Sequence, residues 1–392
     1  MTARRADLLR MRRRAQLLDP LAAGGPAAGD TVPNDPTAVV HRMLAVQAQD
    51  FGAACWALGA RSPGSTRDDV LAALDAGSII RSWPMRGTLH FVPPADLRWM
   101  LGVTTTRMVA GLTARHRQLE LESADFVRAR DIVTDALAGG GRIGRAELMA
   151  LWEANGIATA GQRGYHLIYF LAQTGVLCWG PTHKTQQALV LLDEWAPPAT
   201  ARQLEPDEAL GEFLLRYLLG HGPATVKDFV WWTKGTMAGA KTAIAVLGDR
   251  IGRLEVDGVE YLVAAEHADG GEHADGAEHA EHAHDGRSTS RAAVDLLPAF
   301  DEYLLGYQDR SPVIDDAHFT VVVPGKNGVF APILVSKGRV TGTWRRTTAS
   351  TSVAVEPLPF GRLTAAERAG VKRAATAYGR FLGLPATVTA EA

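Results

Sequence analysis

The chain has 392 residues, of which 46% are hydrophobic and 21% charged, and this near-average composition excludes a wholly disordered protein. No apolar run approaches the roughly 18 residues of a membrane span, and no apolar core follows the N-terminal arginines, so we expect neither a membrane helix nor a secretory signal. Two cysteines, Cys55 and Cys178, cannot make a disulfide framework, and a reducing cytoplasm is the expected location.

The formal net charge of −2 hides a basic majority of the chain. Residues 266–285 contain seven of the acidic side chains and no lysine or arginine. The rest of the chain has 41 basic and 36 acidic residues, because 7 of the 43 acidic residues lie in this stretch. A balance of this kind permits a phosphate-binding face but does not require one.

Residues 1–122 predict a first unit of helices followed by a hairpin. A basic helix covers roughly 4–18, and we expect its arginines to be solvated, with contacts to phosphates as the alternative. A second helix begins at Pro36, because proline is favoured at the first helical position, and ends near Val46. Two more helices follow, and IIRSWPMRGTLHFV supplies two short strands across the turn at 84–87.

The same pattern recurs at 123–204 and, most clearly, at 205–265. In the last copy Thr225 caps a short helix, another helix follows Gly235, and RLEVDGVEYLV alternates around Asp257-Gly258, a strong hairpin signal. Three helices and a hairpin are typical of a winged helix-turn-helix, so the pattern predicts three tandem winged-helix units. One all-α domain with incidental hairpins is the alternative.

The segment 266–290 repeats EHADG and EHA, and we expect a disordered His/Glu-rich insertion because core-forming residues are missing there. A metal-binding tract is the alternative, and we expect deletion of the segment to leave activity intact.

Residues 291–392 predict a C-terminal β-rich domain. Strand-like patterns occur in HFTVVVPG, in GVFAPILVSKGRVTGTWRR with Lys337-Gly338 as a turn, and in TSVAVEPL. LTAAERAGVKRAATAYGRFLG predicts a terminal amphipathic helix. The expected fold class is therefore α+β, with three tandem winged-helix units and this C-terminal domain.

The strongest candidate for chemistry is Gln47-Ala48-Gln49. If this stretch is extended, both amides project from one face, because strand side chains alternate with a period of two. Two neutral amides can hold one water through their carbonyl oxygens, and their dipoles can stabilise a developing positive charge. On spacing alone, two surface glutamines near a helix end are the simpler interpretation.

Four segments stand out when they are taken together: LAVQAQDFGAACWALGAR, RSWPMRGTLHFVPPADLRWML, LLPAFDEYLLGYQDRSPVI and GRVTGTWRR. In these segments the chain resembles the AlkZ-like DNA glycosylases, a bacterial family of tandem winged-helix proteins. The resemblance covers nearly the whole chain apart from the His/Glu-rich insertion. It implies a monofunctional DNA glycosylase that cuts the N-glycosidic bond of bulky or crosslinking N7-alkylguanine adducts, in DNA repair or in self-resistance to a genotoxin.

The catalytic signature of the family is glutamine, an apolar residue and glutamine, which Gln47 and Gln49 match. The resemblance implies that these two residues hold the water that attacks C1′ and stabilise the oxocarbenium-like sugar. An N7-alkylated guanine is already cationic and needs little acid assistance to leave, so neither a metal ion nor an organic cofactor is expected.

Other residues are weaker candidates for contacts to DNA. Beside the first hairpin they are Arg81, Arg86 and His90, and around the C-terminal hairpin, which could probe a groove, they are Lys337, Arg339, Arg345 and Arg346. Beside the first hairpin the alternative is a structural role, in which Trp83 packs and the arginines are solvated or paired, and in the C-terminal part it is an ordinary charged β-turn. Asp301, Tyr303 and Arg310 match the family segment as well, but buried hydrogen bonding explains them equally.

Two other functions remain open because a fold does not determine a function. One is a non-enzymatic winged-helix DNA-binding protein, such as a transcription regulator, which should tolerate the loss of both glutamines. The other is a binder that sequesters a toxic small molecule. Under the glycosylase interpretation we expect a monomer that binds duplex DNA carrying alkylated bases and has no membrane partner.

Overall fold

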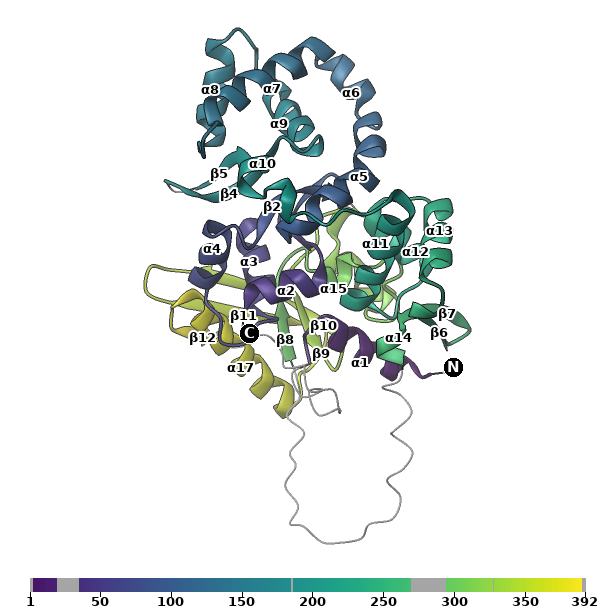
Figure 1. Cartoon of the computed structure of the whole chain (residues 1–392). Coiled ribbons are helices and arrows are strands. Elements are labelled where there is room, and N and C mark those ends of the chain that lie inside the picture. Colours follow the sequence, from purple (N-terminus) through teal and green to yellow (C-terminus); the bar gives the residue numbers. More distant parts are fainter. Residues whose placement is uncertain (1–2, 20–34, 185, 269–293, 327, 390–392) are drawn as a thin grey trace.

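The computed structural model describes residues 3–19, 35–184, 186–268, 294–326 and 328–389, and the chain forms the expected α+β fold (Figure 1). From residue 269 onward the insertion predicted at 266–290 lies outside the described residues. Its first residues belong to a short helix, α14 (Ala265–Ala268), in which His267 Nε2 lies 2.9 Å from Arg42 Nη2. None of the described helices is long and apolar enough to cross a membrane.

The first part of the chain contains four helices and three strands. They are α1 (Arg5–Ala15), α2 (Pro36–Met43), β1 (Val46–Gln47), α3 (Phe51–Gly59), α4 (Arg67–Asp75), β2 (Ile80–Met85) and β3 (Thr88–Val92). Asp35 caps α2 by accepting a hydrogen bond from the Thr37 amide. The helix ends three residues earlier than expected, because Leu44 takes a φ of +62° and turns the chain into β1.

The second part forms a lobe at the top of Figure 1. Its elements are α5 (Pro94–Ala110), α6 (Thr113–Gln118), α7 (Ser123–Leu137), α8 (Arg145–Ala154), α9 (Arg163–Gln173), β4 (Leu177–His183), β5 (Gln186–Leu191) and α10 (Leu192–Trp195). The helices and the hairpin predicted for 123–204 are confirmed. The hairpin does not stand alone, however, since β2 and β4 pair at Arg81 and Trp179 to give one sheet of order β1-β3-β2-β4-β5.

The third part follows the predicted order of three helices and a hairpin. Its elements are α11 (Pro206–His221), α12 (Val226–Thr233), α13 (Met237–Leu247), β6 (Ile251–Val256) and β7 (Val259–Ala264). Thr225 caps α12 by accepting a hydrogen bond from the Asp228 amide, as expected. Asp257 and Gly258 both have positive φ values, 52° and 75°, which is the conformation that a two-residue hairpin turn requires.

The C-terminal part is a five-stranded sheet of order β12-β11-β10-β9-β8 with one long helix against it. Its elements are β8 (Val294–Leu297), α15 (Glu302–Leu305), α16 (Asp316–Val322), β9 (Ile333–Ser336), β10 (Arg339–Thr348), β11 (Val353–Pro359), α17 (Ala365–Leu382) and β12 (Ala386–Val388). The strand predicted for HFTVVVPG is wrong, because this stretch forms α16. Val321 is 53% exposed whereas Val322 is fully buried, so only one face of the stretch packs against the core.

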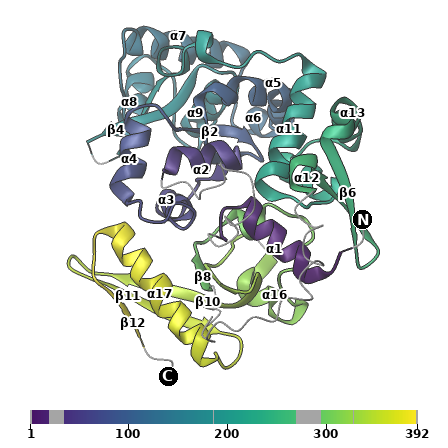
Figure 2. The same cartoon turned by 60° about the horizontal axis from the view of Figure 1, so that its bottom comes forward.

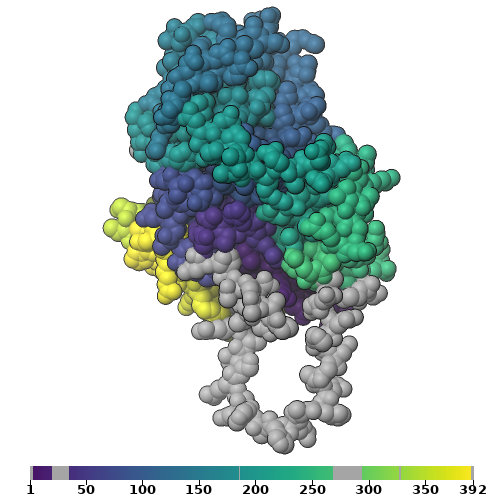
Figure 3. Space-filling view, viewed as in Figure 1, coloured from purple at the N-terminus to yellow at the C-terminus, as the bar shows by residue number. Residues whose placement is uncertain are grey.

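Helix α1 lies between the β6–β7 hairpin and the C-terminal sheet (Figure 2). In the space-filling view, purple residues of the N-terminal part lie in the middle of the molecule, below the upper lobe (Figure 3). The expectation that the arginines of α1 are solvated is wrong for two of them. Arg12 is fully buried, donates to the carbonyl oxygen of Pro223 at 2.9 Å and stacks 3.8 Å from the ring centroid of Tyr307. Arg13 is 4% exposed and pairs with Asp295. These two side chains join α1 to the other parts of the molecule.

Candidate active site

Gln47 and Gln49 lie at the β1 edge of the sheet β1-β3-β2-β4-β5, beside β3. Gln47 is the last residue of β1 and stands opposite His90, and the amide of Ala48 donates to the carbonyl oxygen of Leu89 at 2.7 Å. Gln47 is therefore in a strand, whereas Gln49 lies in a bend, so the expected extended conformation is confirmed for Gln47 and not for Gln49. Ala48 points into the core and is fully buried, whereas Gln47 is partly buried and Gln49 is exposed.

Neighbouring donors fix the orientation of both glutamine amides. Arg86 Nη2 donates to Gln47 Oε1 at 3.4 Å, and the backbone amide of Leu89 donates to Gln49 Oε1 at 3.2 Å. Because an amide oxygen has two lone pairs, each one can accept a second hydrogen bond. Each glutamine thus keeps one acceptor position for a further donor such as water.

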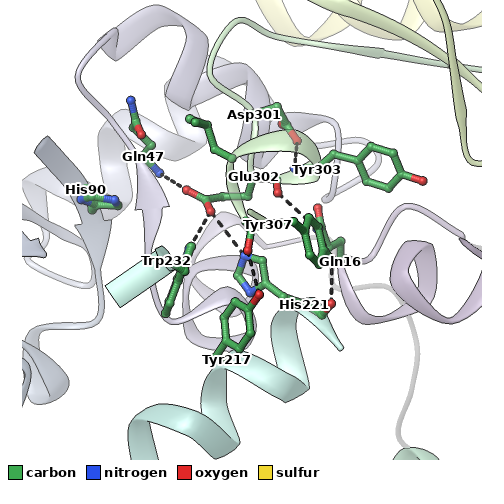
Figure 4. Close-up of polar contacts among 12 residues, drawn as sticks. Gln16, Gln47, His90, Tyr217, His221, Trp232, Asp301, Glu302, Tyr303 and Tyr307 are labelled. Carbon is green, nitrogen blue, oxygen red and sulfur yellow. Dashed lines mark hydrogen bonds and ion pairs between the residues drawn. The ribbon is translucent and has the colours of Figure 1, made fainter. Parts of the chain in front are cut away.

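Arg86 lies in the turn between β2 and β3 with a φ of +57° and forms a buried ion pair with Glu302. Its Nη2 is 2.9 Å from Glu302 Oε1, and the two side chains are 6% and 1% exposed. Glu302 Oε1 also accepts a hydrogen bond from the backbone amide of Gln47 at 3.2 Å. The carboxylate therefore holds Gln47 by its main chain (Figure 4). The guanidinium of Arg86 holds Gln47 by its side chain.

The second oxygen of Glu302 faces the third part of the chain. Trp232 donates its indole N–H to Oε2 at 2.8 Å, and His221 Nε2 lies 3.4 Å from the same oxygen (Figure 4). Burial alone would raise the pKa of Glu302, but Arg86 and the neighbouring imidazoles outweigh burial and hold this pKa well below its usual range. Glu302 is therefore an ionised carboxylate inside the protein, and its role here is to position other groups.

His90 is fully buried, and burial, with the nearby Arg86 charge, lowers its pKa to about 3. Its Nε2 accepts from Arg86 at 2.8 Å, because a guanidinium can only donate, and so its Nδ1–H donates to the carbonyl oxygen of Thr88 at 2.8 Å. The imidazole is neutral with both nitrogens engaged. A contact with DNA does not fit His90 or Arg86, because neither side chain reaches the surface.

Arg81 lies on β2, where it ties the glutamine segment to the second lobe. It donates to the carbonyl oxygens of Ala48 at 2.9 Å and Gln49 at 3.4 Å, and to the side chain of Gln187 at 3.0 Å. Burial lowers the pKa of Arg81 to about 10. Arg81 also lines a pocket together with Gln49 and Gln187.

The C-terminal candidates fall into two groups. The turn at Lys337-Gly338 is packed against the protein, since Tyr303 donates to the carbonyl oxygen of Gly338 at 2.7 Å and a Cβ at Gly338 would lie 3.0 Å from Leu9. The side chain of Lys337 is nevertheless exposed, so its assignment as a contact to DNA stays a prediction. Arg339 pairs with Asp315 beside it, whereas Arg345 and Arg346 are exposed on β10.

Asp301, Tyr303 and Arg310 serve internal contacts. Asp301 forms a bidentate ion pair with Arg61, with both distances 2.8 Å, and caps α15. Tyr303 is fully buried, and Arg310 stacks 4.8 Å from the ring centroid of Trp231. The alternative of buried hydrogen bonding is thus confirmed for Asp301 and Tyr303.

Sequence reasoning missed Glu302 and His221, although both take part in the network around Gln47. A signal for Glu302 was present, because this acidic residue stands inside the apolar and aromatic run AFDEYLLGY. Charged residues are almost never fully buried unless they are paired, so a charge in such a run indicates an internal partner. No comparable signal marked His221.

With this geometry in place, comparison with known proteins decides the family. A family model described as "DNA glycosylase AlkZ-like" matches residues 40–381. The chain belongs to this family. The expectation of a DNA glycosylase is thereby confirmed.

Two comparisons with proteins of Streptomyces sahachiroi, one by sequence and one by structure, extend this result. The chain is 26% identical over 325 residues to an "Interstrand DNA cross-link repair glycosylase", with 78% of this chain and 81% of the relative covered. The solved structure of the DNA glycosylase AlkZ from the same organism has a TM-score of 0.77 at 24% sequence identity, covering 99% of this chain and 100% of the other. This likeness shows that the two proteins share an α+β fold over their whole lengths.

Proposed function

We propose that this AlkZ-like enzyme hydrolyses the N-glycosidic bond of bulky or crosslinking N7-alkylguanine adducts in duplex DNA and leaves an abasic site. The relative from Streptomyces sahachiroi, described as a crosslink repair glycosylase, supports this substrate class. The observation that carries the proposal is the fixed orientation of the Gln47 and Gln49 amides, whose oxygens each keep one free acceptor position.

The leaving group needs little protonation or other assistance from the protein. An N7-alkylated guanine carries a positive charge and becomes neutral when the bond to the sugar breaks. Positive charge develops on the sugar instead, where amide oxygens stabilise it best. A water held by Gln47 and Gln49 attacks C1′, and neutral amides suit this step because no strong base is needed.

Arg86 would oppose such a transition state if its charge were uncompensated. Its guanidinium touches Gln47 Oε1, so a developing sugar cation nearby would be repelled. The ionised Glu302, 2.9 Å from the same Nη2, cancels this charge. We therefore assign Arg86 and Glu302 as positioning residues that hold Gln47 and leave the site close to neutral.

We propose further that the helix–hairpin segments at 1–122, 123–204 and 205–265 are winged-helix units, with residues 291–392 as a separate C-terminal domain. Arg345 and Arg346 are exposed on β10 and keep their assignment as contacts to DNA phosphates. A monomer in the cytoplasm, acting in DNA repair or in self-resistance to a genotoxin, completes the proposal.

The decisive experiment is single-turnover base release from duplexes carrying N7-methylguanine or a bulky N7-guanine adduct. Wild type should release the base, whereas Gln47→Ala and Gln49→Ala should be slower by about 100-fold or more, the usual cost of removing a group that stabilises transition-state charge. Gln118→Ala, at an unrelated surface position on α6, is the matched control and should release the base at the wild-type rate.

Two results would contradict the proposal. Equal rates in wild type and both glutamine variants would support a DNA glycosylase but show that Gln47 and Gln49 are not its catalytic residues. An absence of release from every duplex, together with sequence-selective binding of undamaged DNA, would favour a transcription regulator.

A further inference from the structure

Arg310 carries a positive charge that pairs with no carboxylate in the described part of the chain. Four buried arginines elsewhere each form an ion pair: Arg12, Arg13, Arg61 and Arg86. Arg310 is partly buried and donates to neutral oxygens, from Nε to the carbonyl of Leu304 at 2.8 Å and from Nη1 to the carbonyl of Gln308 at 3.4 Å. Burying a charge without a partner is costly, so such a cation indicates a ligand of opposite charge.

Two carboxylates act on Arg310 from a distance, Asp228 and Asp309, and both are occupied. Asp228 Oδ1 accepts from the backbone amides of Gln308 at 2.8 Å and Asp309 at 3.0 Å. Asp309 Oδ1 accepts from the amide of Ser311 at 2.9 Å. Despite these acids, burial lowers the pKa of Arg310 to about 10. The protein itself therefore compensates the guanidinium charge poorly.

Two aromatic rings hold this guanidinium in place. Its Cζ lies 4.8 Å from the ring centroid of Trp231 and 5.1 Å from that of Phe330. A guanidinium stacks favourably on aromatic rings and can still donate from its edge. Nη2 has no hydrogen-bond partner in the described structure, so Arg310 keeps donor capacity. A cation that is held in advance loses little freedom when it binds an anion.

Lys234 places a second cation at the Trp231 ring. Its Nζ lies 5.9 Å from the ring centroid, its side chain is exposed, and it forms no ion pair within the described residues. Lys234 ends α12 with a φ of +56°, a left-handed conformation in which glycine is favoured. Arg310 and Lys234 thus give the surroundings of one ring two positive charges without a carboxylate partner.

The Trp231 ring also connects these two cations to the proposed catalytic residues. Arg86, which donates to Gln47 Oε1, lies 5.7 Å from the same ring centroid. Glu302 neutralises Arg86, so Arg86 does not compete for an anion. Arg310 and Lys234 therefore lie one aromatic ring away from the residue that positions Gln47.

We propose that Arg310 and Lys234 bind a backbone phosphate of the damaged strand, beside the nucleotide whose glycosidic bond is cut. A guanidinium donates strong hydrogen bonds to phosphate oxygens, and an ammonium adds a point charge. Each strand carries one phosphate for about every 3.4 Å of duplex length, so one lies next to any lesion. The contact reads no base and sets the register of the strand over Gln47. This inference rests on the proposed function, because Gln47 locates the damaged nucleotide.

The test removes the charge from each partner in turn. Equilibrium binding is measured to a duplex with a tetrahydrofuran abasic-site analogue, which cannot react, and each phosphate around this site is replaced singly by a neutral methylphosphonate. In wild type, one replacement should weaken binding by about tenfold, as expected for one charged hydrogen bond. In Arg310→Gln and in Lys234→Gln the same replacement should cost about threefold or less, because part of its partner is already gone. Equal penalties in wild type and both variants would overturn the proposal.

Three further measurements separate binding from a structural role. Arg310→Lys keeps the charge and should recover part of the methylphosphonate penalty, whereas a purely structural arginine would leave Arg310→Lys and Arg310→Gln alike. In single-turnover base release, Lys234→Gln should raise the protein concentration for half-maximal rate by about tenfold and leave the maximal rate nearly unchanged. Arg250→Gln, at an exposed arginine of the short 3-10 helix Gly248–Arg250, is the matched control and should keep the full penalty.

Gln47→Ala distinguishes this inference from the proposed function. The variant should lose base release and yet keep the full methylphosphonate penalty. If no phosphate couples to Arg310 or Lys234 while Gln47→Ala still blocks release, the phosphate site is wrong and the catalytic assignment is supported. If the coupling is found while Gln47→Ala releases the base normally, the phosphate site is supported and the catalytic assignment is wrong.

Discussion

Arg86 is bonded to Gln47 and to Glu302 through the same nitrogen atom. Its Nη2 lies 3.4 Å from Gln47 Oε1 and 2.9 Å from Glu302 Oε1, and His90 Nε2 accepts from it at 2.8 Å. Nη1 of Arg86 also donates to the carbonyl oxygen of Leu305 at 3.0 Å. Because the guanidinium is planar and rigid, these partners fix its position, and its position fixes the orientation of the Gln47 amide. The position of one glutamine oxygen therefore depends on an ion pair formed with a residue 255 positions later in the chain.

Arg86→Lys tests whether this geometry matters beyond the charge. Lysine keeps the positive charge near Glu302, but a single ammonium cannot reproduce the planar fork of the guanidinium. We expect base release to slow by about tenfold, as for loss of one positioning hydrogen bond, with a small change in unfolding free energy. Single-turnover rates and urea unfolding measure the two quantities, and an unchanged rate would remove Arg86 from the positioning role.

Glu302→Gln tests the charge while keeping the shape. The change leaves the buried Arg86 without a counter-ion, and breaking a buried pair in this way costs about 3–5 kcal/mol of stability. Base release should also fall, because the uncompensated guanidinium repels the developing sugar cation. The double variant Arg86→Met/Glu302→Gln should recover much of the stability but not the rate; recovery of both would show that the pair is purely structural.

His90 predicts a loss of stability in acid. The folded pKa is about 3, whereas the unfolded side chain titrates near 6.5, so between these values the unfolded chain binds a proton that the folded chain does not. The free energy of unfolding therefore falls as the pH drops below 6.5, by about 2 kcal/mol for this one group between about pH 7 and 5. Burial also lowers the pKa of His221, which adds to the same loss.

The measurement is urea unfolding of wild type and His90→Gln at both pH values. Glutamine keeps an acceptor for Arg86 but does not titrate, so the variant should lose about 2 kcal/mol less on acidification than wild type. Equal losses in the two proteins would mean that the pKa of His90 does not differ between the folded and unfolded states.

Burial of the N-terminal arginines predicts unequal effects along one helix. Arg12→Ala should lower the free energy of unfolding by about 3 kcal/mol or more, because it removes the stacking on Tyr307 and leaves the buried Asp228, 3.9 Å away, without its cation. Arg10→Ala, whose side chain is 63% exposed, should change the unfolding midpoint within experimental scatter. Similar midpoints for the two variants would contradict the burial of Arg12.

The exposed arginines of β10 predict a change in the salt dependence of DNA binding. Each phosphate contact contributes about 0.9 to the slope of log K against log[salt], so Arg345→Gln/Arg346→Gln should reduce the slope by about 2. Arg339→Gln is the matched control, since Arg339 is occupied by Asp315. Binding of undamaged duplex DNA over a salt series gives the slope. An unchanged slope in the double variant would show that Arg345 and Arg346 do not contact DNA phosphates.

Local sequence signals predicted the structure correctly where neighbouring residues determine the backbone conformation. The Asp257-Gly258 turn, the Thr225 cap and Pro36 at the start of α2 are all found as predicted, because each depends on a few neighbouring residues. The stretch HFTVVVPG failed for the opposite reason. Its β-branched residues favour a strand, but the C-terminal core offers room for one face of a helix, and packing overrides propensity.

In the candidate site, too, a local motif could be predicted from the sequence and the long-range contacts could not. The Gln47-Ala48-Gln49 motif could be found from the sequence, and the extended conformation of Gln47 was predicted correctly, whereas the bend at Gln49 was not. The network that holds it could not, because the partners of Gln47 come from distant segments. No spacing rule links Glu302 or His221 to Gln47, and the pairing of β2 with β4 at Arg81 and Trp179 is equally non-local.

The contacts of Glu302 also determine when the enzyme can first work during its synthesis. The carboxylate that anchors Gln47 emerges only after the first three parts of the chain have been made. A nascent chain that ends before residue 302 can contain both glutamines and still lack the group that holds Arg86 in place. If Gln47 is catalytic as proposed, we expect activity to begin only after the C-terminal part of the chain has been translated and has docked, and a product that ends before residue 302 should not release the base.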